Sequence, residues 1–263
     1  MAIKIYQVDA FTNQAFSGNP AAVCVLEKEA DKDWMQSVAF ETNLPETAFL
    51  YPTGDTYNLR WFTPKVEVDL CGHATLASAH ILWEEGYLDS DQVAQFYTRS
   101  GLLSASKNGD IIELDFPTAI EKEAQIPDGL KEGLGINPIY IGKNRFDYLV
   151  QVENDEQVRN LEPNFELLKK VPSRGVIVTS SCDSSEYDFV SRFFAPVSGI
   201  DEDPVTGSAH CCLGPFWAKK FGKLQLKGLQ VSERGGVVHV SVNGDRVVLG
   251  GNAVTVLRGE IVV

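Results

Sequence analysis

The chain has 263 residues, with 23 Lys and Arg against 36 Asp and Glu, so its formal net charge is −13. Nucleic acid is therefore not an expected partner, because phosphate binding depends on clustered Lys and Arg. No apolar run approaches the roughly 20 residues of a membrane span. The first residues are typical of a strand rather than a signal peptide, and five cysteines lack the spacing of a disulfide framework, so we expect a cytoplasmic protein.

Short strands and two helices are predicted for the first half of the chain. Hydrophobic periodicity and turn residues place strands at 3–9, 21–26, 47–51, 57–63, 92–98, 101–107 and 111–116, and helices at 32–43 and 73–86. Asp31 or Asp33 is the expected N-cap of the first helix, and Gly86 is the expected C-cap of the second. Asn108-Gly109 predicts a tight hairpin.

The second half repeats the pattern of the first at an offset of 135 residues. Residues 99–110 and 234–245 are identical at six of twelve positions without a gap. Helix 73–86 corresponds to a predicted helix at 208–221, and both are small and apolar almost all round, as buried helices are. We therefore predict an internal duplication. The expected fold class is α+β, with two pseudo-symmetric lobes, each a curled, mainly antiparallel sheet around a central helix.

The charged stretch 117–127 lacks periodicity, and we interpret it as the linker between the lobes. This interpretation places an N-terminal lobe at 1–118 and a C-terminal lobe at 119–263. The last predicted strand, about 253–261, is a candidate to return to the first lobe.

Both central helices begin at a glycine, with Gly72 before His73 and Gly207 before Ser208. Helix N-termini carry unpaired N–H groups and a partial positive charge, so two lobes of this kind can hold a small carboxylate between the N-termini of their central helices. Alternatively, the glycines only permit tight strand-to-helix turns. We favour binding because a glycine followed by a polar residue occurs twice.

Two carboxylates are candidate site residues. Asp203, followed by Pro204, lies closest to the second central helix, whereas Asp201 and Glu202 are expected to complement the helix dipole. Glu46 precedes an apolar strand, where it either faces solvent or is partly buried with a raised pKa. A raised pKa suits a base that removes a proton from carbon near neutral pH.

Other site types have little support in the sequence. It contains no glycine motif for a dinucleotide or a phosphate, no His-Glu-x-x-His and no Gly-x-Ser-x-Gly. Cys71-x-His73 alone is weak evidence for a metal, and none is predicted. Cys71 directly precedes a helix N-terminus, where a thiolate is favoured, whereas Cys211 and Cys212 lie in an apolar helix and are expected to pack.

Several segments together resemble the phenazine-biosynthesis PhzF-like isomerase family. They are residues 9–12, 18–23, 41–49, 71–75 and 202–210, in order over most of the chain. The resemblance implies the diaminopimelate-epimerase fold, with the active site between two lobes, no cofactor and a homodimer. It also implies Glu46 as the catalytic carboxylate, and His73, Asp203 and Ser208 as substrate contacts.

The predicted function is a cofactor-independent isomerase that moves a proton between carbons of a small anionic, carboxylated metabolite, with Glu46 as acid and base. Two alternatives stay open. Related epimerases use one cysteine per lobe; Cys71 matches the first position, but Thr206 stands at the second. A Cys71-assisted amino- or hydroxy-acid epimerase or racemase, with Asp203 as a possible second group, is the first alternative. A non-catalytic metabolite-binding or protein-interaction module is the other.

Overall fold

The computed structural model of the protein describes residues 3–262. The chain forms two compact units: unit 1 is Met1–Asp115 with Gly250–Val263, and unit 2 is Phe116–Leu249. The last strand pairs with the first over eight residues, so the end of the chain belongs to the same unit as its beginning. The division into lobes at 1–118 and 119–263 stays a prediction.

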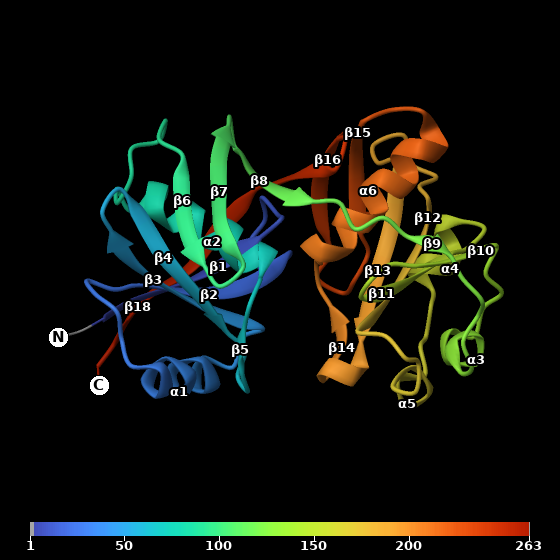
Figure 1. The fold of residues 1–263 in the computed structure, drawn as a ribbon, viewed down its shortest axis with the longest axis horizontal. Helices are drawn as coiled ribbons and strands as arrows, with labels where there is room; N and C mark the ends of the chain where they lie inside the picture. Colours follow the sequence, from blue (N-terminus) through green and yellow to red (C-terminus); the bar gives the residue numbers. More distant parts are fainter. Residues whose placement is uncertain (1–2, 263) are drawn as a thin grey trace. The chain divides into compact units, whose positions relative to one another are not determined.

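Unit 1 is a mixed sheet with two helices (Figure 1). Its elements are β1 (Ile3–Ala10), β2 (Asn19–Val25), α1 (Lys32–Thr42), β3 (Glu46–Thr53), β4 (Thr56–Phe62), β5 (Glu67–Val68), α2 (Gly72–Glu84), β6 (Ala94–Thr98), β7 (Gly101–Asn108), β8 (Ile111–Pro117) and β18 (Ala253–Ile261). The expected N-cap of α1 is confirmed, because the Asp31 carboxylate accepts the N–H groups of Asp33 and Trp34. Buried side chains of α1 pack with Phe49 and Phe62.

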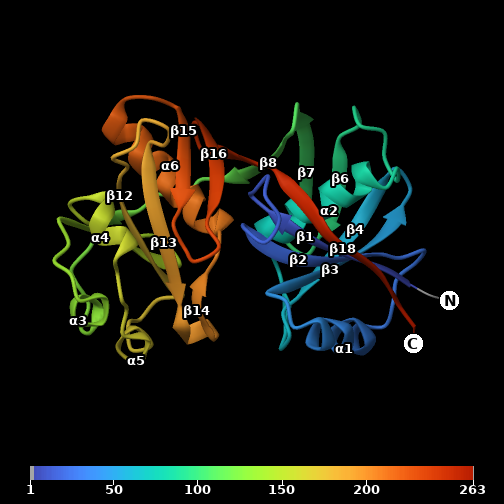
Figure 2. The same ribbon diagram turned by 180° about the vertical axis from the view of Figure 1, so that it is seen from behind.

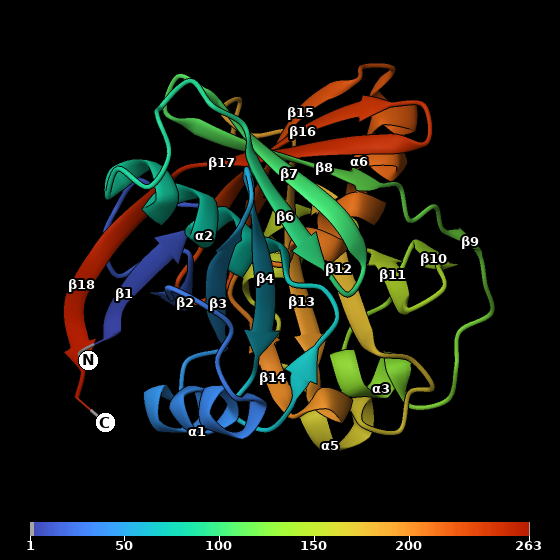
Figure 3. The same cartoon turned by 60° about the vertical axis from the view of Figure 1, so that its left-hand side comes forward.

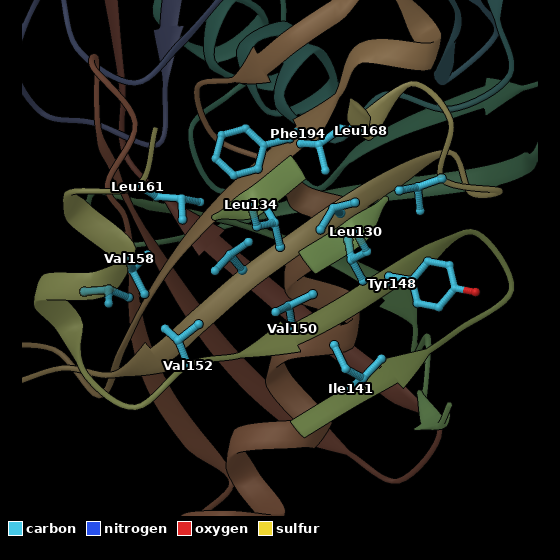
Figure 4. Packing of buried hydrophobic residues seen from close by; sticks show 14 residues of the cluster. Leu130, Leu134, Ile141, Tyr148, Val150, Val152, Val158, Leu161, Leu168 and Phe194 are labelled. Carbon is cyan, nitrogen blue, oxygen red and sulfur yellow. The ribbon is translucent and has the colours of Figure 1, made fainter. Parts of the chain in front are cut away.

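Unit 2 has the same kind of sheet and more short helices (Figure 2). Its elements are β9 (Lys122–Glu123), α3 (Leu130–Leu134), β10 (Tyr140–Lys143), β11 (Asp147–Gln151), α4 (Asp155–Arg159), α5 (Phe165–Leu168), β12 (Gly175–Ser181), β13 (Phe189–Ala195), the 3₁₀ turn η1 (Pro196–Ser198), β14 (Ile200–Asp203), α6 (Gly207–Phe221), β15 (Gln225–Gln230), β16 (Gly236–Asn243) and β17 (Arg246–Gly251). A cluster of aliphatic side chains, with Tyr148 and Phe194, packs between α3–α5 and β10–β13 (Figure 4).

The two units repeat one order of strand pairing. In unit 1, β1–β2 is antiparallel, β2–β3 parallel, β3–β4 antiparallel, β4–β6 parallel and β6–β7 antiparallel. In unit 2, β10–β11, β11–β12, β12–β13, β13–β15 and β15–β16 follow the same alternation. The predicted duplication into two pseudo-symmetric lobes is therefore confirmed, and α2 and α6 occupy equivalent positions in the two repeats.

The central helices are buried because their side chains are small and apolar. Ten of the thirteen residues of α2 are buried, and α2 packs on β1, β2, β3, β7 and β18 (Figure 3). Ten of the fifteen residues of α6 are buried. At Gly214 of α6, an added Cβ would lie 2.7 Å from a methyl group of Val240, so only glycine lets β16 approach this closely.

Two sequence predictions need correction. Helix α2 ends at Glu84 with Glu85 as its C-cap, one residue before the predicted Gly86. Gly86 follows in the left-handed region at φ 73°, where glycine commonly ends a helix, and its N–H donates to the Trp83 carbonyl at 3.3 Å. The supposed linker 117–127 contains β9, which pairs with β10 in the sheet of unit 2. A charged strand of two residues shows no alternation, so it could not be recognised. Within residues 3–262, no helix combines the length and the apolar character needed to cross a bilayer.

Candidate active site

Three side chains meet at the N-terminus of α2 in unit 1, and we call them the Glu46 cluster: Glu46, Cys71 and His73. Glu46 is the first residue of β3, directly after Pro45, where β3 runs parallel to β2. The Glu46 Oε2 lies 3.2 Å from Nε2 of His73, and the two side chains are 14% and 8% exposed. Of the two environments that the sequence leaves open for Glu46, solvent-facing or partly buried, the structure shows the partly buried one, beside the start of α2.

The second partner of His73 is Cys71, the N-cap residue of α2. Its thiol makes no capping hydrogen bond, and its carbonyl accepts the hydroxyl of Thr75 at 2.5 Å. The Cys71 Sγ instead lies 3.5 Å from Nδ1 of His73. Sulfur, imidazole and carboxylate thus form a chain, in which each ring nitrogen of His73 faces a different neighbour.

Electrostatics in the Glu46 cluster favour a protonated imidazole. Burial alone lowers the pKa of His73, but the neighbouring Cys71 and Glu46 outweigh it and raise that pKa well above its usual value. Burial raises the pKa of the Cys71 thiol, with a further contribution from Glu46. Cys71 is therefore a neutral thiol near pH 7, so the Glu46 carboxylate is the effective partner of the His73 charge. A thiolate favoured by the helix N-terminus was expected, and burial outweighs that effect.

The contact between His73 and Glu46 is a charge contact rather than a well-aligned hydrogen bond. The Nε2 of His73 is buried and has no hydrogen-bond partner in the described part of the chain, although the carboxylate lies within ion-pair distance. Buried polar groups without such a partner are rare and need an explanation. An acceptor on a bound ligand would provide one.

The three side chains of the Glu46 cluster also offer the donor types that Zn²⁺ prefers. One ligand atom from each lies within 4.8 Å of the other two. However, the close contacts of His73 use both of its ring nitrogens, Nδ1 toward Cys71 and Nε2 toward Glu46. A metal ion takes one nitrogen of an imidazole, so this arrangement fits an imidazolium held between the thiol and the carboxylate better than a chelate.

In unit 2, Asp203 lies at the end of β14 and just before α6. Thr206, the N-cap residue of α6, donates its hydroxyl to Oδ2 of Asp203 at 2.5 Å. The buried Gln230 accepts the N–H of Thr206 at 2.9 Å and donates to the Asp203 carbonyl at 2.7 Å. Gln230 therefore fixes both the turn before α6 and the Asp203 backbone.

Ser208, the second residue of α6, has a cationic neighbour. Its Oγ accepts a hydrogen bond from Nη2 of Arg174 at 2.9 Å, and Arg174 also pairs with the buried Asp147. Gly72 and Gly207 are the first residues of α2 and α6, as the sequence predicts. Glu202 does not serve the helix dipole as expected, because its carboxylate pairs with Arg192 at 2.7 Å.

The sequence therefore indicates residues at the N-termini of both α2 and α6. It does not indicate the side chains that support those of unit 2: Gln230, Arg174 and Asp147. Each is at least 24 residues away in sequence from the group that it supports. No motif or period links such distant positions. The one local signal is an arginine directly before an apolar strand, which is too common to indicate a site.

His210, one turn into α6, gives a prediction for acid stability. Its Nδ1 donates to the Thr206 carbonyl at 2.8 Å, and burial lowers its pKa to about 4. The unfolded state, with the usual pKa near 6.5, binds the proton more tightly, so stability contributed by neutral His210 is complete above about pH 6.5 and is lost as pH falls toward 4. At pH 4.5 this loss is about 2–3 kcal/mol.

His210→Asn keeps a side-chain donor and removes the titration. In urea unfolding at pH 7 and pH 4.5, wild type is expected to lose about 2–3 kcal/mol more between the two pH values than the variant does. Carboxylates common to both proteins cancel in this difference. Equal losses in the two proteins would contradict a neutral, buried His210.

Together, two repeats of one sheet, each around a buried helix, define the fold of the epimerase-like isomerases. A hydroxyproline epimerase from Agrobacterium vitis has this fold, with a TM-score of 0.64 over 99% of this chain and 92% of that one, at 12% identity. The chain belongs to the phenazine biosynthesis-like protein family, whose model matches residues 8–259. This membership confirms the resemblance to PhzF-like isomerases.

Relatives in the family cover the chain from end to end. An uncharacterized isomerase of Halalkalibacterium halodurans is 58% identical over 262 residues, which are 99% of each chain. The crystal structure of a PhzF-family phenazine biosynthesis protein from Enterococcus faecalis superposes with a TM-score of 0.96 at 42% identity, with full coverage of both chains. The protein is therefore an enzyme of the PhzF-like isomerase type.

Proposed function

We propose that the protein moves a proton between two carbons of a small carboxylated metabolite, with Glu46 as the single acid and base and with no cofactor. The observation that carries this proposal is the 3.2 Å contact between the Glu46 carboxylate and His73 in a nearly buried cluster. A carboxylate held in this way is shielded from water and oriented by a positive charge. Exclusion of water favours proton abstraction from carbon, and the positive charge stabilises the negative charge that then develops on the substrate.

The proposed reaction needs no net change in charge or redox state. Glu46 takes a proton from carbon, so that a C–H bond breaks, an O–H bond forms, and the electron pair moves into the conjugated system of the substrate. The carboxyl proton exchanges with solvent, since the Glu46 side chain is 14% exposed, and the O–H bond then breaks as a proton passes from Glu46 to a second carbon. His73 keeps its proton throughout, and its Nε2–H, which lacks an aligned acceptor, is a donor for the anionic substrate.

Residues of both units take part in the proposal as substrate contacts. They are Gly72 and His73 in unit 1, and Asp203, Gly207 and Ser208 in unit 2. The glycines contribute backbone N–H groups at the first turns of α2 and α6. The proposal also includes that the protein forms a homodimer and is located in the cytoplasm.

Deuterium incorporation tests the reaction type. Wild-type protein in D₂O is incubated with a panel of small unsaturated carboxylic acids and amino acids, and the products are examined by NMR. A product with a shifted double bond and deuterium at a new carbon supports the isomerase. Deuterium at the original carbon with inversion of configuration would instead support an epimerase.

The Cys71-assisted epimerase is a second candidate because the Cys71 Sγ lies 3.5 Å from His73 Nδ1. The raised pKa of the Cys71 thiol and the threonine at the equivalent N-cap of α6 both disfavour it. In the isomerase, Cys71→Ala is expected to keep turnover within about threefold of wild type, because the thiol transfers no proton. The test compares kcat for Cys71→Ala and for Cys24→Ala, which removes another buried thiol. Loss of kcat in Cys71→Ala alone would favour the epimerase.

A further inference from the structure

Arg174 in unit 2 is held in one orientation by its surroundings. It directly precedes β12, and its backbone N–H donates to the Phe146 carbonyl at 2.8 Å. Its guanidinium carbon lies 5.3 Å from the centre of the Phe146 ring and 5.6 Å from that of Phe193. Gly175 makes room for the second ring, because a Cβ there would lie 2.4 Å from the Phe193 Cζ.

A buried carboxylate fixes the guanidinium further. Asp147 is 1% exposed and accepts Nε and Nη2 of Arg174 at 2.9 and 2.5 Å, a two-point pair. Asn144 accepts the backbone N–H of Asp147 at 2.8 Å and so holds the start of β11. The pair therefore ties Arg174, which directly precedes β12, to the first residue of β11.

The donors of Arg174 are only partly used. Two of its five N–H groups go to Asp147 and a third goes to Ser208 Oγ at 2.9 Å. The Nη1 has no hydrogen-bond partner among residues 3–262, and the side chain is 40% exposed. Two N–H groups of one nitrogen are thus available beside Ser208.

The contact with Arg174 determines what Ser208 can do. A guanidinium donates hydrogen bonds and accepts none. The Ser208 Oγ is therefore the acceptor in this contact, and its own hydrogen points elsewhere. The Ser208 hydroxyl can therefore donate its hydrogen to a ligand, beside the positive charge of the Arg174 guanidinium.

The adjacent position of the repeat carries the opposite charge in unit 1. Glu46 begins β3 and contacts His73, the second residue of α2. Arg174 immediately precedes β12, the strand equivalent to β3, and contacts Ser208, the second residue of α6. Val176 pairs with Phe194 as Thr47 pairs with Phe62, so the residue equivalent to Glu46 is Gly175, and Arg174 lies one residue before it. Adjacent positions of the duplicated fold thus hold a carboxylate beside an imidazole in unit 1, and a guanidinium beside a hydroxyl in unit 2.

We propose that Arg174 is a positioning residue that fixes Ser208 as a hydrogen-bond donor and gives this part of unit 2 its preference for a carboxylate. The inference rests on the proposed function, since it assigns to Ser208 the acidic group of that substrate. The Ser208 O–H, oriented by Arg174, suits one oxygen of a planar carboxylate, and the guanidinium charge beside it favours an anion there. A phosphate has more oxygens to satisfy than this one donor can serve.

Binding of benzoate, benzamide and inorganic phosphate to the full chain tests the proposal by NMR titration. Wild type is expected to bind benzoate more tightly than the uncharged benzamide and the phosphate. Arg174→Met is expected to weaken benzoate binding roughly tenfold to a hundredfold, because it removes a charge-assisted donor set. Equal binding of benzoate and benzamide, or tighter binding of phosphate, would overturn the carboxylate preference.

Arg145→Met is a matched control, because Arg145 lies 5.1 Å from the Phe146 ring and its removal lowers the net charge equally. It is expected to leave benzoate binding within about twofold of wild type. Equal effects of the two substitutions would reduce the role of Arg174 to general charge and overturn the proposal.

Arg174→Met also leaves the Asp147 carboxylate buried without its partner. Two further variants therefore keep the test decisive if the Arg174→Met protein does not fold. Arg174→Lys retains the charge but not the planar fork, and is expected to bind benzoate several-fold more weakly than wild type. Ser208→Ala is expected to weaken binding too, and adding Arg174→Lys to it should cause little further loss, because Arg174 acts through Ser208. Full additivity of the two effects would refute a positioning role.

Glu46→Gln separates this inference from the proposed function. The variant is expected to bind benzoate as wild type does, whatever happens to turnover. If Glu46→Gln loses turnover while Arg174→Met binds benzoate normally, only the role of Arg174 fails. If Arg174→Met loses benzoate while Glu46→Gln keeps turnover, the acid–base role of Glu46 fails.

Discussion

Glu46→Gln is expected to lower kcat by roughly 10²- to 10⁴-fold or more, because the amide cannot accept a proton from carbon. The side chain keeps its shape, so the fold and the binding of the substrate should be nearly unchanged. The measurement is the rate of deuterium incorporation from D₂O into a substrate that wild type turns over, with the melting temperature recorded alongside. The loss should appear in kcat rather than in KM.

Glu84→Gln is the matched control for this variant. Glu84 also pairs with a histidine, His80, at 3.5 Å, and belongs to the same helix as His73. Its substitution removes the same charge from another His–Glu pair and is expected to leave kcat within about twofold of wild type. A Glu46→Gln protein that exchanged deuterium at the wild-type rate would rule out Glu46 as the base.

Most helices and strands follow from local sequence signals. The strand expected at 253–261 is β18, and the helix expected at 32–43 is α1 with the Asp31 cap. Alternation and capping act over a few residues, so the sequence displays them directly. The two-residue strands β5 and β9 lie below that length, and their pairing depends on neighbours far away in the chain.

The candidate site, unlike the helices and strands, follows only in small part from local sequence signals. The segments that contain Glu46, His73 and Asp203 resemble a known family. From the residues alone, Glu46 fits a solvent-facing strand end as well as it fits a partly buried base. Arg174 and Ser208 are 34 residues apart, and Arg174 and Asp147 are 27 apart. Such contacts depend on which residues of adjacent strands lie opposite each other and on how the next helix crosses them. Neither can be derived from periodicity in one segment.

The duplicated fold explains why the two units carry different chemistry on one framework. Equivalent strands and helices fix equivalent positions, and single substitutions then change the group placed there. The N-cap of the central helix is Cys71 in unit 1 and Thr206 in unit 2. Thr206 gives its hydroxyl to Asp203, whereas Cys71 faces His73. A symmetric pair of thiols is therefore absent, which favours a single acid–base group over two.

His73→Asn is the second variant with a large expected effect, because it removes the positive charge next to Glu46. We expect kcat to fall roughly 10²-fold, as for the loss of one stabilising donor in other active sites. The pKa of His73 is raised well above 6.5, so wild type keeps the imidazolium through neutral pH and loses activity only as pH rises through that raised pKa. The variant should lack this alkaline decline in kcat.

Folding stability gives an independent readout of the same charge. Because the His73 pKa is higher in the folded state, its ion pair contributes fully to stability below about pH 6.5, and the contribution disappears as pH rises through the folded-state pKa.

The control for the kcat profile of His73→Asn is His80→Asn. Burial lowers the pKa of His80, which therefore titrates on the acid side. If His80→Asn removed the alkaline decline in kcat and His73→Asn retained it, the group beside Glu46 would not be the one that titrates. If instead only His73→Asn removes the decline, the imidazolium that contacts Glu46 is the charge on which turnover depends.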